Sequence, residues 1–121
     1  MTPILFAASV DHNAAKAFYS EVMNFRLVDD NPFSLEFDAG GTMLRVQKVA
    51  ELHPHPFTAL GWRVDDIAAE RDLLAGRGVK FLRFEFMQQD ERDIWTSPDG
   101  AKVCWFHDPD GNTLSLSQFS D

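Results

Sequence analysis

The side chains that could do chemistry in this chain are four histidines, one cysteine and several polar residues that alternate with apolar ones. His53 and His55 lie in the segment 53–56 (HPHP), whose His-x-His spacing could chelate a metal ion. The two prolines favour an extended connector, and we expect that structural role instead. His12 and His107 are expected at the surface, with proton transfer by His107 as the alternative, and we assign no catalytic residue.

Cys104 lies in an apolar run, residues 103–106 (VCWF). A reactive cysteine needs an electropositive and partly exposed site, so we interpret Cys104 as a small buried hydrophobic residue. A single cysteine cannot form an intramolecular disulfide, and the N-terminal residues lack the pattern of a signal peptide. These features predict a cytoplasmic protein.

Arg45 is the most informative polar residue of the first half. It alternates with a leucine and a valine, so it should share one face of a strand with Gln47, opposite to the apolar face. A guanidinium on such a face binds a carboxylate or a phosphate. The partner is either an anionic ligand or an internal carboxylate, Glu36 or Glu85. The alternative is that the side chain extends outward to the solvent at the rim.

The second half offers a matching set. Arg63 should share a face with Ala59 and Gly61, and Ser115 and Ser117 should share one with Thr113. Residues 86–100 form a loop long enough to be functional, and Trp95 within it could stack on a flat ligand, whereas Trp62 and Trp105 are expected in or near the core. The candidate ligand-binding residues are Phe6, Arg45, Gln47, Arg63, Trp95, Ser115 and Ser117.

The length, composition and charge of the chain restrict the kind of protein that it can be. The chain has 121 residues, 45% of them hydrophobic, which suits one globular domain. Its formal net charge is −8 and it has no basic run, which argues against binding to nucleic acid or to an anionic membrane. No segment reaches the roughly 20 apolar residues of a membrane span.

Apolar periodicity and turn residues predict the order β-α-β-β-β twice. The first module, residues 1–49, has a strand at 3–10, a helix at 12–24 capped by Asp11, and strands at 25–29, 32–38 and 42–49. A connector, 50–56, leads to the second module, 57–121. This module has a strand at 57–64, a helix after Asp65 and Asp66 that ends at Gly76 and Gly78, and strands at 79–85, 101–107 and 112–119.

The two halves also align with each other, as an internal repeat would. Residues 9–25 match 63–79 at an offset of 54, and 40–47 match 110–117 at an offset of 70. The larger second offset places an insertion in the loop 86–100. We predict a single α+β domain, residues 1–121, in which two βαβββ modules form a cup-shaped mixed sheet with helices on its outer face.

The segments 11–25 (D-x3-A-x2-FY-x5-F) and 105–116 (WF-x-DPDGN-x-L-x-L) resemble the vicinal oxygen chelate superfamily, the glyoxalase, bleomycin-resistance and extradiol-dioxygenase proteins. The resemblance covers nearly the whole chain and implies a homodimer. It also implies up to four metal ligands, one on the first and last strand of each module. Those positions here are Ile4, Arg45, Ala59 and Ser115, which departs from the usual His, Gln or Glu, so we expect no metal and no cofactor.

The function that follows is a glyoxalase/bleomycin-resistance-like protein that binds a small organic molecule in a metal-free cup. Two alternatives stay open. One is an enzyme of the glyoxalase or dioxygenase type, a lyase or isomerase, and the other is a protein-interaction subunit with a vestigial cup.

Overall fold

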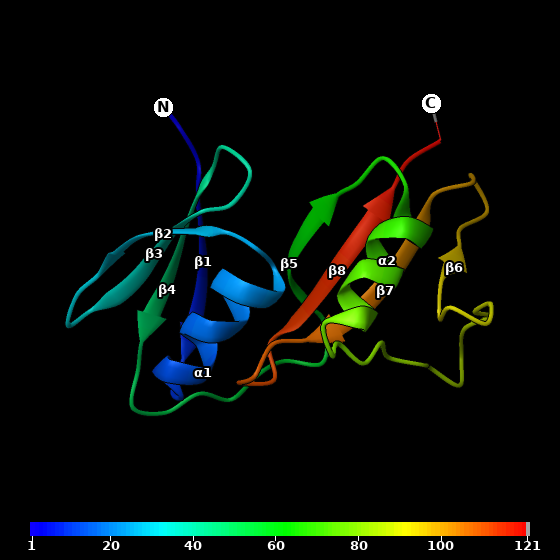
Figure 1. Ribbon diagram of the computed structural model, residues 1–121. Helices are drawn as coiled ribbons and strands as arrows, with labels where there is room; N and C mark the ends of the chain where they lie inside the picture. Colours follow the sequence, from blue (N-terminus) through cyan, green and yellow to red (C-terminus); the bar gives the residue numbers. More distant parts are fainter. Residues whose placement is uncertain (121) are drawn as a thin grey trace.

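The computed structural model describes residues 1–120, which form two four-stranded mixed sheets with helices packed against them (Figure 1). The first sheet has the order β1-β4-β3-β2, and β1 is parallel to β4. Its strands are β1 (Ile4–Ser9), β2 (Arg26–Asp30), β3 (Ser34–Asp38) and β4 (Met43–Lys48). Between β1 and β2 lie the helix α1 (His12–Ala17) and a π-helical turn, η1 (Phe18–Val22), where one continuous helix was predicted.

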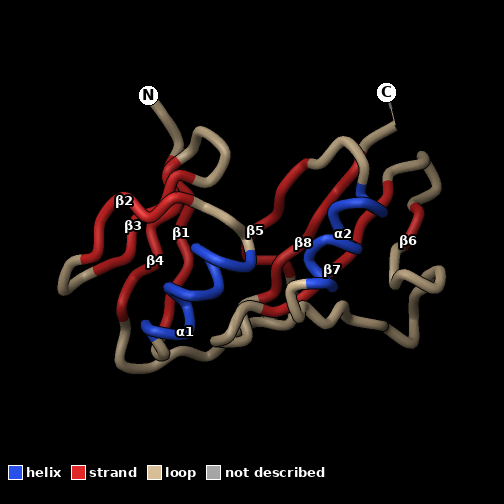
Figure 2. The backbone as a smooth tube through the Cα atoms, in the orientation of Figure 1, coloured by secondary structure: helices blue, strands red, loops and turns tan. Residues whose placement is uncertain are grey.

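The second sheet repeats this arrangement with the order β5-β8-β7-β6, and β5 is parallel to β8. Its elements are β5 (Thr58–Arg63), α2 (Ile67–Gly76), β6 (Trp95–Thr96), β7 (Lys102–His107) and β8 (Thr113–Gln118). The α+β class and the two-module order are confirmed. Figure 2 shows how much of the second module between α2 and β7 is loop, in contrast to the compact first module. No helix among residues 1–120 is long and apolar enough to cross a bilayer.

The strand predicted at 79–85 is wrong. Only Phe81 makes an isolated bridge, to Phe106 of β7, and the Leu82 amide donates to the Trp105 carbonyl at 2.8 Å. The side chain of Gln89 forms hydrogen bonds with the backbone of this segment. Its Oε1 accepts from the Phe84 amide at 2.7 Å and its Nε2 donates to the Leu82 carbonyl at 2.9 Å. The side chain of Gln89 therefore makes hydrogen bonds that a neighbouring strand would otherwise make. The fourth strand of the sheet is instead the short β6, in the loop that follows.

The positions of the two helix caps differ by one residue from the offset of 54 that the internal repeat predicts. Asp11 caps α1 by accepting from the Ala14 amide at 3.2 Å, and Asp66 caps α2 by accepting from the Ala69 amide at 3.1 Å. The caps are therefore 55 residues apart, and Asp65 is outside the helix. The C-terminal end of α2 is as predicted, because Gly78 adopts φ 98° and its amide donates to the Ala75 carbonyl at 3.0 Å.

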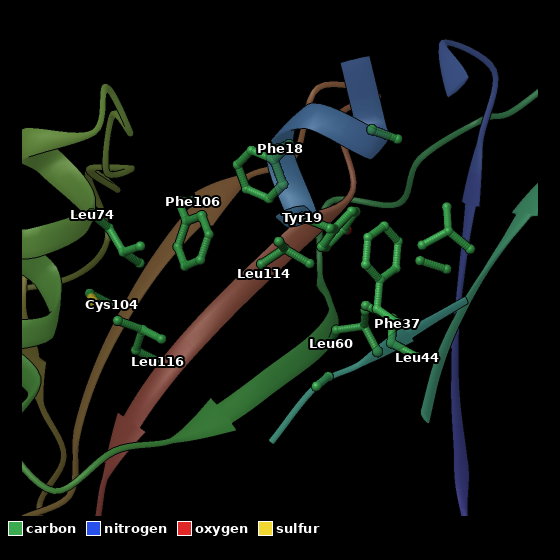
Figure 3. Packing of buried hydrophobic residues seen from close by; sticks show 14 of the residues in the cluster. Phe18, Tyr19, Phe37, Leu44, Leu60, Leu74, Cys104, Phe106, Leu114 and Leu116 are labelled. Atoms are coloured by element: carbon green, nitrogen blue, oxygen red, sulfur yellow. The ribbon is translucent and has the colours of Figure 1, made fainter. Parts of the chain in front are cut away.

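A hydrophobic cluster of the described residues joins the two modules (Figure 3). Phe18 lies 6.4 Å from Phe106 of the second sheet, and Tyr19 lies 5.7 Å from Phe37 of the first, measured between ring centroids. The helical segment of the first module thus packs on both sheets. Cys104 is fully buried in this core as predicted, and burial raises the pKa of its thiol to about 12.

Two aspartates of the turn between β7 and β8 hold the modules together. Asp110 accepts hydrogen bonds from the Ser9 hydroxyl at 2.6 Å and from the Val10 and Asp11 amides at 2.8 and 3.0 Å. Asp108, only 5% exposed, accepts from the Tyr19 hydroxyl at 2.7 Å. The sequence predicted a tight turn here but gave no sign that its carboxylates would reach the other module, because the acceptors and donors are about a hundred residues apart.

Candidate functional site

Strand alternation gives each sheet an open face, which points away from the helices. In β4, Leu44 and Val46 are fully buried, whereas the Arg45 side chain is 39% exposed and Gln47 is exposed. Phe6 of β1 pairs with Arg45 and is 48% exposed on the same face. The predicted orientation of these strands is confirmed, and Phe6, Arg45 and Gln47 lie together.

Arg45 has an internal partner, which is Glu36 rather than Glu85. Its Nη2 and Nε donate to Glu36 Oε1 at 2.7 and 3.2 Å across the β3–β4 pair. Both bonds end on one oxygen, so Oε2 of Glu36 and Nη1 of Arg45 keep hydrogen-bonding capacity. The pair borders a shallow hollow of about 350 Å³ that also includes Phe33 and Gln47.

On the second sheet, Ser115 and Ser117 also lie on the open face, beside Gly61 and Arg63 respectively. A methyl group at Gly61 would come within 2.6 Å of Ser115 Oγ, so the serine hydroxyl occupies the space that the glycine leaves. Ser115 is only 6% exposed. The Arg63 guanidinium lies over the Phe119 ring, 5.4 Å from its centroid, at the far end of β5.

An aromatic cluster, which we name the tryptophan wall, covers the outer part of this open face. It consists of Trp95, Trp105 and Phe84, with ring centroids of Trp95 and Phe84 lying 6.3 and 5.6 Å from that of Trp105. Trp105 Nε1 donates to Thr58 Oγ1 at 3.0 Å, which fixes the indole across the sheet. Trp105, expected in or near the core, is half-buried on the open face, because its strand neighbours Cys104 and Phe106 take the buried face.

Arg45 and Trp95 do not lie together within one chain. Arg45 is in the first sheet, whereas Trp95 is in the outer strand of the second, and β1, β5, β8 and β7 come between them. At about 4.8 Å per strand, the separation along the surface is on the order of 20 Å. The hollow beside Arg45 does not include Trp95.

The four strand positions that hold metal in the resembling families do not form a metal site here. Ile4 and Ala59 have no donor atom, Arg45 is a cation held by Glu36, and Ser115 offers one hydroxyl. In the parallel pairs, Phe6 of β1 lies opposite Arg45 and Gly61 of β5 lies opposite Ser115, and neither side chain has a donor atom. Within residues 1–120, no three His, Cys, Asp or Glu side chains are grouped so that they could hold a metal ion.

The histidines are dispersed. His55 stacks on Phe57 in the connector, with ring centroids 4.9 Å apart, and His107 is exposed at the end of β7. His12 corrects the prediction of an exposed side chain, because its Nε2 is buried and has no hydrogen-bond partner among the described residues.

Comparison with known proteins identifies the family. The sequence profile of the Glyoxalase/Bleomycin resistance protein/Dioxygenase superfamily matches residues 5–116. The chain belongs to this superfamily. A search of curated proteins found no match.

Solved structures of the superfamily share the fold over the whole chain. A glyoxalase/bleomycin resistance protein/dioxygenase from Alicyclobacillus acidocaldarius is 19% identical, with a TM-score of 0.77 over 100% of this chain and 92% of that one. A lactoylglutathione lyase from Agrobacterium tumefaciens is 16% identical, with a TM-score of 0.74 over 98% and 92%. TnmS3 from Streptomyces sp. CB03234, described as an antibiotic binding protein, is 26% identical, with a TM-score of 0.74 over 99% and 96%.

Proposed function

We propose that this superfamily member binds a small planar organic molecule on the open face of its second sheet, without a metal ion. The tryptophan wall is the observation that carries the proposal. Aromatic rings on an open sheet face offer apolar ring faces on which a planar molecule can stack, and the nearby hydroxyls of Thr58, Ser115 and Ser117 can orient a polar group. The likeness to TnmS3, described as an antibiotic binding protein, supports the same class of function.

The alternative of a lyase, isomerase or dioxygenase has no specific support in the described residues. The metal positions hold Ile4, Arg45, Ala59 and Ser115, which cannot together supply the three or four donors of a catalytic metal. We therefore keep binding as the proposal, with Phe6, Arg45, Gln47 and Arg63 as further candidate contacts.

Binding can be tested with daunorubicin, a planar aromatic antibiotic whose positive charge suits a chain of net charge −8. We expect saturable shifts of the Trp95 and Trp105 indole N–H signals in ¹H–¹⁵N NMR spectra. Trp95→Ala should weaken binding about two- to tenfold, the value of one aromatic contact. Val28→Ser is the control, because this half-exposed valine lies on β2, the outer strand of the first sheet and away from the wall. Signals that do not move, or an unaffected Trp95→Ala variant, would contradict the proposal.

We also propose that the protein is a homodimer, which would let a ligand contact Arg45 of one chain and Trp95 of another. Ile4, Phe6 and Phe33 are 42%, 48% and 81% exposed, which leaves apolar surface on the first module. Light scattering coupled to size-exclusion chromatography should give about twice the mass of one chain. The mass of a single chain would reject the dimer and confine the ligand to the tryptophan wall.

A further inference from the structure

A cleft of about 600 Å³ lies between the two modules on the helix side of the sheets, opposite to the open faces. Its floor includes Trp62 of β5, Val64 directly after that strand and Leu116 of β8. Its walls are α2 and the turns before β2 and β4. The cleft is larger than the hollow beside Arg45, and no step of the proposed function uses it.

The interior of the cleft is apolar and partly aromatic. Phe25 and Trp62 line it with ring centroids 5.4 Å apart and planes inclined by 40°. Leu73 of α2 also lines the cleft and is 48% exposed, whereas Leu74 beside it is buried. A flat apolar molecule would cover surface that the folded chain leaves in water.

The rim of the cleft carries guanidinium groups, although the chain as a whole has a net charge of −8. Arg26 and Arg77 line it, together with the carboxylates of Asp38 and Glu70. The Arg26–Asp38 contact is 3.5 Å long and its arginine side chain is 72% exposed, so it is a weak pair. Arg77 donates one Nη1 bond to the Val22 carbonyl at 2.7 Å, which holds the guanidinium at the cleft and leaves it other donors.

Trp62, which lines the cleft, also carries an unused hydrogen-bond donor. Trp62 Nε1 is buried and has no partner among the described residues, although almost all buried donors in folded proteins are paired. Leaving such a group unpaired is unfavourable, and an acceptor that enters between the rim side chains would relieve this cost.

We propose that this cleft is a second small-molecule site, separate from the open-face site, and that it binds a planar aromatic acid. The ring system would lie against Phe25, Trp62 and Leu73. The carboxylate would pair with Arg77 and accept from Trp62 Nε1. Because the walls come from both modules, the bound acid would also hold the modules together.

The test uses 2-naphthoate as the probe and the three tryptophan indole N–H signals as reporters, each assigned with a Trp→Phe variant. We expect a saturable shift of the Trp62 signal and a higher melting temperature. The neutral analogue 2-naphthalenemethanol should bind at least about fivefold more weakly, since a charge-assisted bond is lost. Equal binding of the acid and the alcohol would overturn the assigned ligand class.

Two variants at Leu73 separate charge from packing. Leu73→Asp and Leu73→Asn have similar shape and helix propensity, but only the aspartate brings a negative charge to the cleft. We expect Leu73→Asp to weaken 2-naphthoate binding at least about fivefold more than Leu73→Asn, and Arg77→Gln to weaken it about five- to tenfold. Equal effects at Leu73, or shifts confined to Trp95 and Trp105, would overturn the cleft site, and the second result would leave the open-face site standing.

Discussion

Tyr19 shows how one side chain links the sequence motif to the fold. Its ring is fully buried between the modules, and its hydroxyl donates to Asp108 Oδ2 at 2.7 Å. The same carboxylate accepts from the side-chain amide of Asn112 at 2.8 Å. Burial raises the pKa of Tyr19 far above its ordinary value, and the neighbouring negative charge of Asp108 raises it further. Tyr19 is therefore a permanent donor that keeps the buried carboxylate satisfied.

Replacing Tyr19 by phenylalanine removes this donor and preserves the ring. We expect the free energy of unfolding to fall by about 1.5–3 kcal/mol, the usual contribution of a hydrogen bond to a charged group. Urea denaturation at pH 7 measures the change. An unchanged free energy would mean that the hydroxyl does not stabilise Asp108.

The same pair predicts a pH dependence with a definite sign. The unfolded tyrosine ionises near pH 10, whereas the folded one keeps its proton, so the unfolded state binds fewer protons above that pH. The stability contributed by Tyr19 is thus present below pH 10 and declines above it by about 1.4 kcal/mol per pH unit. The stability difference between the natural chain and Tyr19→Phe should shrink above pH 10; parallel curves would contradict the raised pKa.

At the scale of the elements, the helix caps decide where each module begins its helix. Asp66 accepts from the Ala69 amide, whereas Asp65, next to it in the sequence, makes no side-chain hydrogen bond among those described. Both residues are exposed, so packing does not separate them. The one-residue shift relative to the sequence alignment follows from this choice of cap.

The adjacent aspartates provide a matched pair of variants. Asp66→Ala should lower the free energy of unfolding by about 1 kcal/mol, because the amide at the start of α2 loses its acceptor. Asp65→Ala should leave stability within about 0.5 kcal/mol. Thermal and urea denaturation of the two proteins measure the difference. A larger effect at Asp65 would show that Asp65 caps the helix, as the alignment offset of 54 predicts.

At the scale of the whole molecule, the two modules form one body because their contacts are both apolar and polar. Phe18 and Tyr19 bring the first helical segment onto the second sheet, and Asp110 of the β7–β8 turn receives three donors from the end of β1. This turn fixes how the open faces and the helix-side cleft are oriented. The ligand proposals for both surfaces depend on that fixed orientation.

Removal of the Asp110 carboxylate should loosen the junction locally. In Asp110→Ala, we expect the Val10 and Asp11 amides to exchange hydrogen at least about tenfold faster, because both donate to Asp110 Oδ1. Hydrogen-exchange NMR measures each amide. Glu91→Ala, which removes an 82% exposed carboxylate, is the control and should change neither amide; equal exchange in both variants would show that Asp110 does not hold the junction.

Apolar alternation and turn residues in the sequence were sufficient to predict the two modules, the open-face position of Arg45, Gln47, Arg63, Ser115 and Ser117, and the burial of Cys104. These features depend on neighbours within a few residues, where periodicity and backbone preferences act directly. The same local reasoning predicted Trp105 in or near the core and a strand at 79–85. It had no means to detect that Trp105 lies on the open face or that Gln89 binds the backbone of that segment.

The tertiary structure alone decided which charged and aromatic groups meet. It paired Arg45 with Glu36, brought Asp108 and Asp110 to the first module, assembled the tryptophan wall and separated it from Arg45. It also enclosed Trp62 in a cleft between modules. Each of these contacts joins different elements, many of them far apart in the sequence, and their geometry follows from how the strands pair and the sheets pack. A single sequence encodes that packing through many weak interactions together, so no local pattern reveals it.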